Sequence, residues 1–334
     1  MPKHTAEQVF RMACAHVQSG RHADAETLCR DILRAAPGHR DVLLLLAILT
    51  QRNGDKNAGD EWLRQAIANN DCSITISGKL DPRPRWAPHP KLSGMLEQNL
   101  ERYRETLRSF EAYLPWLEKI AFDEDPQQPE EPYWNNVWMP ALDAMALYCL
   151  VAGRRPRRYV EIGSGNSTKF VARAIADHKL DTEIISIDPE PRAEIDALCD
   201  EVLRSPLEKC NLELFGTLGA DDIVFADNSH QSFMNSDVTV FFCEILPALA
   251  PGVTVGIHDI FLPHDYPEDW IGRYYSEQYL LACYLLAETQ RFDVMLPMFF
   301  ANERGLCATL IPQTAGIHND PRLCSGTSFW LEMR

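Results

Sequence analysis

One segment constrains the fold more than any other, the run RYVEIGSGNSTKFVARAI from Arg158 to Ile175. Its apolar start suits a buried strand, and Gly163 and Gly165 then permit a tight turn and the close approach of a ligand. Ser167 and Thr168 suit the N-terminal end of the next helix. A strand, turn and helix of this kind form a nucleotide-type pocket at the carboxyl edge of a parallel sheet.

The rest of the C-terminal half repeats the same rhythm, with apolar strand-like runs that alternate with helical runs. The candidate strands are residues 159–162, 183–187, 212–215, 223–226, 253–257, 292–296, 306–311 and 327–331. This alternation predicts an α/β fold with a parallel, doubly wound sheet and an antiparallel edge near the C-terminus.

A different periodicity occupies the N-terminus. Gly20 and Gly54 are 34 residues apart, apolar positions repeat at the same interval, and Pro37 comes after the second predicted helix. This period resembles that of tetratricopeptide repeats, so residues 6–39 and 40–71 are each expected to form a helical hairpin within a region over 1–71. Two repeats bury little apolar surface alone, so we expect them to dock on the C-terminal part of the chain. Their role stays open between binding a partner protein, self-association, and capping the fold.

Residues 72–132 are expected to connect the two regions. Four prolines between 72 and 92 indicate irregular structure. Apolar residues at helical spacing predict a helix over 92–120 that Pro115 kinks or ends. The acidic, proline-rich run 123–132 predicts an exposed loop, and the last domain is placed at 133–334, with a helix over 139–151 at its start.

Composition excludes several classes of function. The formal net charge of -16 argues against nucleic acid as the main partner, because phosphate binding needs a basic face. No apolar run approaches the roughly 20 residues that span a bilayer, and the N-terminus lacks an apolar signal core. The ten cysteines include no CxxC pair, which argues against a structural zinc site. We therefore expect a cytoplasmic protein without nucleic-acid or membrane partners.

The glycine turn departs from the dinucleotide fingerprint, because Thr168 stands where G-x-G-x-x-G has its third glycine. Glu161 precedes the first glycine by two residues, and Glu-x-Gly-x-Gly resembles motif I of the class I S-adenosylmethionine-dependent methyltransferases. The resemblance implies a Rossmann-like methyltransferase sheet and a role for Glu161 in holding the methionine amino end, directly or through water. It also implies that the turn lines the cofactor, with Gly163, Ser164, Gly165, Asn166 and Ser167 as binding residues.

Asp188 ends the next predicted strand, 25 residues after Gly163. A carboxylate there suits the two hydroxyls of a ribose, so Asp188 is a further cofactor-binding candidate. NAD enzymes use the same device, and this position alone does not separate the two classes.

Two later strand ends do separate them. Asp227 and His230 come after the strand over 223–226, and His258 and Asp259 come after the strand over 253–257. Because neighbouring strand ends meet at one crevice, the four side chains are expected to converge on the methyl donor. A hydride-transfer enzyme needs no such cluster. Asp227 is assigned to cofactor binding, and His230, His258 and Asp259 to catalysis.

The cluster is similar to that of metal-dependent O-methyltransferases that act on sugars of natural products. The resemblance implies that Asp227 and Asp259 contribute to a magnesium site and that His230 is the base. His258 stands where that family has a carboxylate, and magnesium prefers oxygen ligands. Without a metal, His230 or His258 would serve as base unaided.

The favoured hypothesis is methylation of an oxygen on a sugar or another small polar acceptor. Aromatic residues at Tyr133, Trp134 and Trp138 and the segment 263–270 are candidate walls of the acceptor pocket. Three alternatives stay open: a protein methyltransferase that recruits its substrate through the repeats, an NAD(P)-dependent oxidoreductase, and a non-catalytic repeat scaffold.

Overall fold

A computed structural model describes residues 6–53, 55–68, 88–136, 138–191, 193–308 and 324–334. The chain divides into two compact units, Met1–Leu80 and Asp81–Arg334. Each unit has a hydrophobic core of its own.

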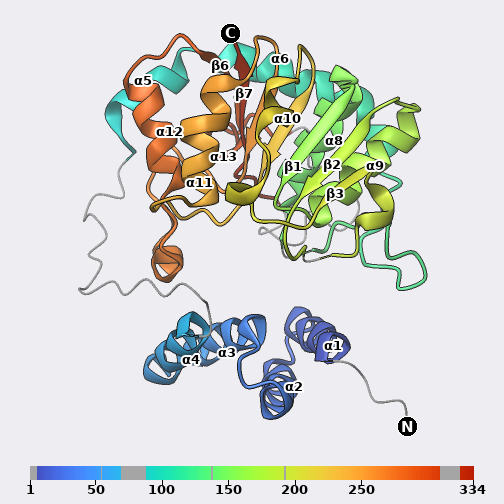
Figure 1. The fold of residues 1–334 in the computed structure, drawn as a ribbon, viewed down its shortest axis with the longest axis vertical. Helices are drawn as coiled ribbons and strands as arrows, with labels where there is room; N and C mark the ends of the chain where they lie inside the picture. The colour runs from blue at the N-terminus through green and yellow to red at the C-terminus, as the bar shows by residue number, and fades with distance from the viewer. Residues whose placement is uncertain (1–5, 54, 69–87, 137, 192, 309–323) are drawn as a thin grey trace. The chain divides into compact units, whose positions relative to one another are not determined.

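The first unit consists of helices. Its elements are α1 (Ala6–Gln18), α2 (His22–Ala35), α3 (Arg40–Arg52) and α4 (Lys56–Ala68) (Figure 1). They form two helical hairpins, as expected for 6–39 and 40–71, with 69–71 outside the described residues. Gly20 turns the chain after α1 with a φ of 72°, and Gly59 lets α4 approach α3, because a Cβ there would lie 2.4 Å from Cγ of Gln51. Assignment to the tetratricopeptide family stays a prediction.

The second unit is built on a seven-stranded sheet. Its strands are β1 (Arg158–Ile162), β2 (Glu183–Ile187), β3 (Glu201–Leu203), β4 (Ile223–Ala226), β5 (Thr254–Ile257), β6 (Phe292–Pro297) and β7 (Phe329–Met333). The strand order is β3-β2-β1-β4-β5-β7-β6; the first five strands are parallel, and β7 runs antiparallel to both of its neighbours. This confirms the predicted α/β, Rossmann-like class. The antiparallel strand is β7, which lies next to the edge strand β6 and not at the edge itself.

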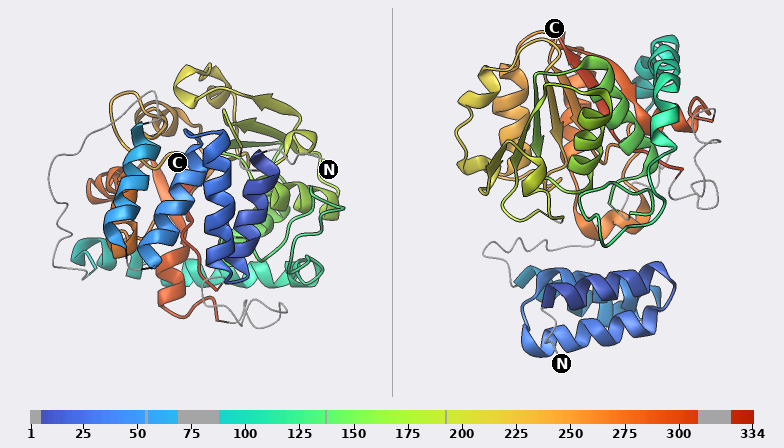
Figure 2. Two further views of the ribbon diagram at one scale, coloured as in Figure 1. Left: turned by 90° about the horizontal axis from the view of Figure 1, so that it is seen from below. Right: turned by 90° about the vertical axis from the view of Figure 1, so that its right-hand side faces the viewer.

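Helices cover both faces of this sheet (Figure 2). The α-helices described in this unit are α5 (Pro90–Glu97), α6 (Leu100–Phe110), α7 (Leu114–Leu117), α8 (Ala141–Arg154), α9 (Asn166–His178), α10 (Glu213–Gly216), α11 (Asp237–Val240), α12 (Glu277–Leu286) and α13 (Met298–Glu303). The long helix α8 is buried from residue 141 to 152, because its apolar residues meet both the sheet core and α9.

The expected helix over 92–120 is divided into α5, α6 and α7. Pro115 lies in the first turn of α7, where its missing N–H costs no helical hydrogen bond. Tyr103, Leu107 and Phe110 of α6 are buried in the same core as the sheet. These helices therefore belong to the second unit, and the acidic run 123–131 after them is largely exposed.

Two strand predictions need correction. Residues 213–216 form the short helix α10, because the side chain of Asn211 accepts a hydrogen bond from the Glu213 amide and starts a helical turn. The true third strand, β3, has only three residues and carries little sequence signal. Residues 306–308 form a turn, and the rest of the strand expected over 306–311 lies outside the described residues.

None of the helices in the described part of the chain combines the length and the apolar character that crossing a bilayer requires.

The register of the central strands sets up the site. Ile162 of β1 pairs with Ala226 of β4, which pairs with Ile257 of β5. The three strands therefore end at the same level, and the residues just after them are brought together at one edge.

Candidate functional site

The turn after β1 is shaped by a glycine. Gly163 has a φ of 80°, in the left-handed region, and a Cβ at this position would lie 1.7 Å from the carbonyl oxygen of Asp227. Its amide donates to the Ile187 carbonyl at 3.0 Å. Only glycine fits between the ends of β1 and β4, so the turn keeps its path close to Asp227.

Glu161 supports the turn from inside the protein. Its side chain is fully buried, and its carboxylate accepts hydrogen bonds from the hydroxyls of Tyr159, at 2.8 Å, and Thr168. Burial raises the pKa of Glu161 to about 7, although hydrogen bonds from Ser167, Thr168 and Tyr159 partly oppose this rise. Thr168, in place of a third glycine, thus ties the end of β1 to the first turn of α9.

Asp188 connects the end of β2 to the same turn. Its Oδ2 accepts from the Ser164 amide at 2.8 Å, and its Oδ1 accepts from the Glu190 amide at 2.7 Å. The side-chain hydroxyls of Ser164 and Ser186 lie 2.8 Å apart. The carboxylate is partly exposed, so it retains free lone pairs toward solvent.

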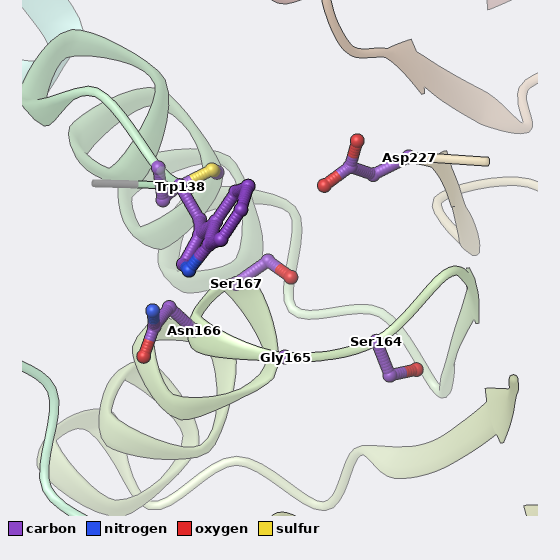
Figure 3. A pocket seen from close by; sticks show the side chains of 7 residues that line it. Trp138, Ser164, Gly165, Asn166, Ser167 and Asp227 are labelled. Carbon is purple, nitrogen blue, oxygen red and sulfur yellow. The ribbon is translucent and has the colours of Figure 1, made fainter. Parts of the chain in front are cut away.

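A pocket opens in front of this turn (Figure 3). It is lined by Trp138, Met139, Ser164, Gly165, Asn166, Ser167 and Asp227. Four of these residues were predicted from the glycine turn and one from the end of β4. Glu161 and Asp188 are not in the lining. Trp138 is half exposed at the rim, whereas Trp134 is buried against Phe170 and forms no wall.

Next to Asp227 lies a buried cluster of the other predicted residues. Nε2 of His230 lies 3.2 Å from Oδ1 of Asp227 and 3.6 Å from Oδ2 of Asp259. Nδ1 of His258 lies 3.2 Å from Oδ1 of Asp227 and 3.6 Å from Oδ1 of Asp259. The structure therefore brings all four residues together. One nitrogen of each imidazole faces the same two carboxylates.

Two further carboxylates, absent from the sequence prediction, hold the outer sides of the imidazoles. Glu277 at the start of α12 is hydrogen bonded to Nδ1 of His230, and Oδ2 of Asp143 in α8 lies 3.3 Å from Nε2 of His258. Both carboxylates are fully buried. In sequence, Glu277 resembles an ordinary acidic residue of a helical first turn and Asp143 a lone charge in an apolar helix. Only the burial of these two acidic side chains in apolar surroundings distinguishes them from ordinary charged residues of helices.

The electrostatics of the cluster result from this arrangement. Burial alone disfavours imidazolium, but the carboxylates that face each ring outweigh it and raise the pKa values of His230 and His258 well above their ordinary range. Burial would raise the pKa of Asp227, yet the two histidines lower it below its usual range. The surrounding carboxylates therefore favour the protonated form of both imidazoles.

The backbone around the cluster is held in unusual conformations. His230 and Asp259 have φ values of 59° and 56°, in the left-handed region that side chains rarely adopt. The amides of Ser276 and Glu277 donate to the His230 carbonyl at 2.8 and 3.3 Å, and the Thr327 hydroxyl donates to Oδ1 of Asp259 at 3.1 Å. Such conformations persist only where the surrounding structure enforces them, as here.

Comparisons with known proteins agree with the fold. A family model described as a methyltransferase domain matches residues 160–260, which include β4, β5, most of β1 and the predicted site residues Glu161 to Asp259. No curated protein sequence matches the chain.

Two solved structures show distant likeness. The SAH-bound methyltransferase PaMTH1 of Podospora anserina is 16% identical over 78% of this chain and 100% of its own, with a TM-score of 0.37. A K341M mutant of the O-GlcNAc transferase of Thermobaculum terrenum is 17% identical over 67% of this chain and 46% of its own, with a TM-score of 0.20. At these TM-scores neither neighbour bears on the activity.

Proposed function

We propose that the chain is an S-adenosylmethionine-dependent methyltransferase that acts on a hydroxyl of a small polar acceptor, with sugars among the candidates. The observation that carries this proposal is the double position of Asp227. Its side chain lines the pocket in front of the glycine turn and also contacts both buried imidazoles. A cofactor pocket and a cluster of polar catalytic groups therefore share one carboxylate.

The chemistry of the turn supports this choice of cofactor. The N-terminal end of α9, a helix of 13 residues, favours the methionine carboxylate next to Asn166 and Ser167. Asp227 faces the positively charged part of S-adenosylmethionine, and Asp188 accepts hydrogen bonds from its ribose hydroxyls. Glu161 keeps the turn in shape from behind, through Thr168, and does not contact the ligand directly.

In this proposal the acceptor lies beyond Asp227, next to His230, His258 and Asp259. Methyl transfer is an in-line displacement, so the cluster must hold the acceptor oxygen close to the methyl group and help it lose its proton. The aromatic rings of Tyr266, Trp270 and Tyr275 pack together beside His230, with the Tyr275 ring centroid 4.4 Å from that of His230. They offer an acceptor a flat, apolar side.

A divalent cation fits the same cluster. Ligand atoms of Asp227, His230 and Asp259 all lie within 4.8 Å of one another. These residues, which include both carboxylates predicted to bind magnesium, would hold the ion. A divalent ion bound there makes a coordinated hydroxyl more acidic.

Calorimetry with S-adenosylmethionine and with NAD tests the cofactor assignment. We expect saturable heat with S-adenosylmethionine and none with NAD. Asp188→Ala should weaken binding by about tenfold or more, because a charge-assisted hydrogen bond contributes about 1.5–3 kcal/mol. The exposed Asp181 on the loop before β2 provides the control Asp181→Ala, which should bind as the wild type does. Binding of NAD alone by the folded chain would instead establish the oxidoreductase alternative.

A further inference from the structure

The cluster at the ends of β4 and β5 has a repeated pattern. The inner nitrogens, Nε2 of His230 and Nδ1 of His258, face both Asp227 and Asp259 at 3.2 to 3.6 Å. The outer nitrogens face one buried carboxylate each, Glu277 and Asp143. A carboxylate on the far side of an imidazole is the usual means by which proteins orient a histidine that binds a metal.

The supporting carboxylates are firmly placed. Asp143 accepts from the amides of Thr327 and Ser328 at 2.7 to 2.9 Å, so a segment distant in the chain fixes its position. Glu277 begins α12, whose first amide also donates to the His230 carbonyl. One oxygen of Glu277, Oε2, is buried without a hydrogen-bond partner. Such a group is costly in a protein interior unless its charge is balanced nearby.

The charge of the cluster is compatible with a bound cation. Four carboxyl groups, of Asp143, Asp227, Asp259 and Glu277, surround two imidazoles. Among the described residues, no lysine or arginine forms an ion pair with any of the four. Protonation of the two imidazoles balances part of this acidic charge, and a divalent cation that displaces their two protons would balance it equally.

We propose that Asp227, His230, His258 and Asp259 form a two-histidine, two-carboxylate site for a first-row transition metal ion, such as manganese, iron or cobalt, in preference to magnesium. Glu277 and Asp143 are the positioning residues that hold the inner nitrogens toward the ion. Magnesium favours all-oxygen sites, whereas imidazole suits the transition metals. The inference rests on the proposed function, because it concerns the same site, and it changes His230 from a base into a ligand.

The test uses the full chain, freed of metal with a chelator and then titrated separately with Co²⁺ and Mg²⁺. Calorimetry gives the affinities, and the visible absorption of Co²⁺ reports imidazole ligands directly. We expect one Co²⁺ per chain with visible absorption bands, and much weaker binding of Mg²⁺. Equal affinity for the two ions, or Co²⁺ without these bands, would overturn the assignment.

Two variants distinguish the role of a metal ligand from that of a positioning residue. His258→Asp should weaken Co²⁺ and strengthen Mg²⁺, since it replaces a nitrogen donor by oxygen. Glu277→Gln should weaken Co²⁺ by about ten- to a hundredfold, the usual effect of removing such a support. Glu288→Gln is the matched control, because Glu288 lies just beyond the other end of α12 in a surface ion pair with Lys91. It should bind Co²⁺ as the wild type does. Unchanged Co²⁺ affinity in a folded Glu277→Gln protein would refute the positioning role.

The outcome for the metal is independent of the outcome for the cofactor. Calorimetry with S-adenosylmethionine on the same samples reports the pocket in front of the glycine turn. Cofactor binding without Co²⁺ binding would refute the metal site and leave the methyltransferase intact. Co²⁺ binding without cofactor binding would refute the methyltransferase and leave the metal site intact.

Discussion

At the scale of single residues, the site depends on a buried side chain and a backbone conformation that only their immediate surroundings can stabilise. Glu161 is a fully buried acid whose two oxygens are occupied by Tyr159 and Thr168. Gly163 occupies a position where no side chain fits against Asp227. Neither residue lines the pocket in front of the glycine turn, and both hold the turn that shapes it.

The pKa of Glu161 makes a prediction about stability. Its folded-state pKa of about 7 lies above its ordinary value of 4.5, so the folded protein binds the proton more tightly. The contribution of this proton to folding stability is complete below the ordinary pKa of 4.5 and is lost as the pH rises through the folded-state pKa of about 7. We expect Glu161→Gln to be relatively more stable at pH 8 than at pH 5, compared with wild type, by a few kcal/mol.

Urea unfolding at the two pH values measures this difference. Glu190→Gln serves as the control, because Glu190 is exposed after the end of β2. The same offset between Glu161→Gln and wild type at both pH values would show that the ionisation of Glu161 does not change between them, contrary to the raised pKa.

At the scale of elements, the ends of β1, β4 and β5 place the site. The sequence predicted these strands because each is a short apolar run that ends in a polar group. Sequence patterns do not reveal which distant helices reach the cluster. Asp143 of α8 and Glu277 of α12 approach it only through the packing of helices on the sheet, and no spacing in the chain records that contact.

The close packing of β5 gives an element-scale prediction. A Cβ on Gly256 would lie 2.6 Å from Cζ3 of Trp330 and 2.7 Å from Cδ2 of Phe225, so Gly256→Ala must push the neighbouring strands apart. We expect a loss of stability of about 1–3 kcal/mol and weaker Co²⁺ binding, since His258 and Asp259 come directly after β5.

Thermal unfolding and Co²⁺ titration check this expectation. Gly216→Ala is the matched control, because a Cβ there meets nothing within 4 Å. It should not be destabilised. Full stability of Gly256→Ala would mean that the strands yield more easily than their packing implies.

At the scale of the whole molecule, a helical unit precedes a doubly wound sheet unit. The 34-residue period and the alternation of strands predicted both, because each pattern extends over many residues and tolerates local exceptions. Prediction failed for short elements such as β3 and α10, where a few side-chain contacts decide the structure. The role of the helical unit stays a prediction: it would recruit a partner protein, mediate self-association or stabilise the chain.

The most direct test of methyl transfer traces label from S-adenosylmethionine into the two fractions of a cell extract. The full chain is incubated with the methyl-labelled donor and either the small-molecule or the protein fraction. We predict label in polar small molecules, lost with Asp227→Asn, which alters the carboxylate shared by pocket and cluster. Label confined to protein, or no transfer from a donor that the chain demonstrably binds, would contradict the proposed function.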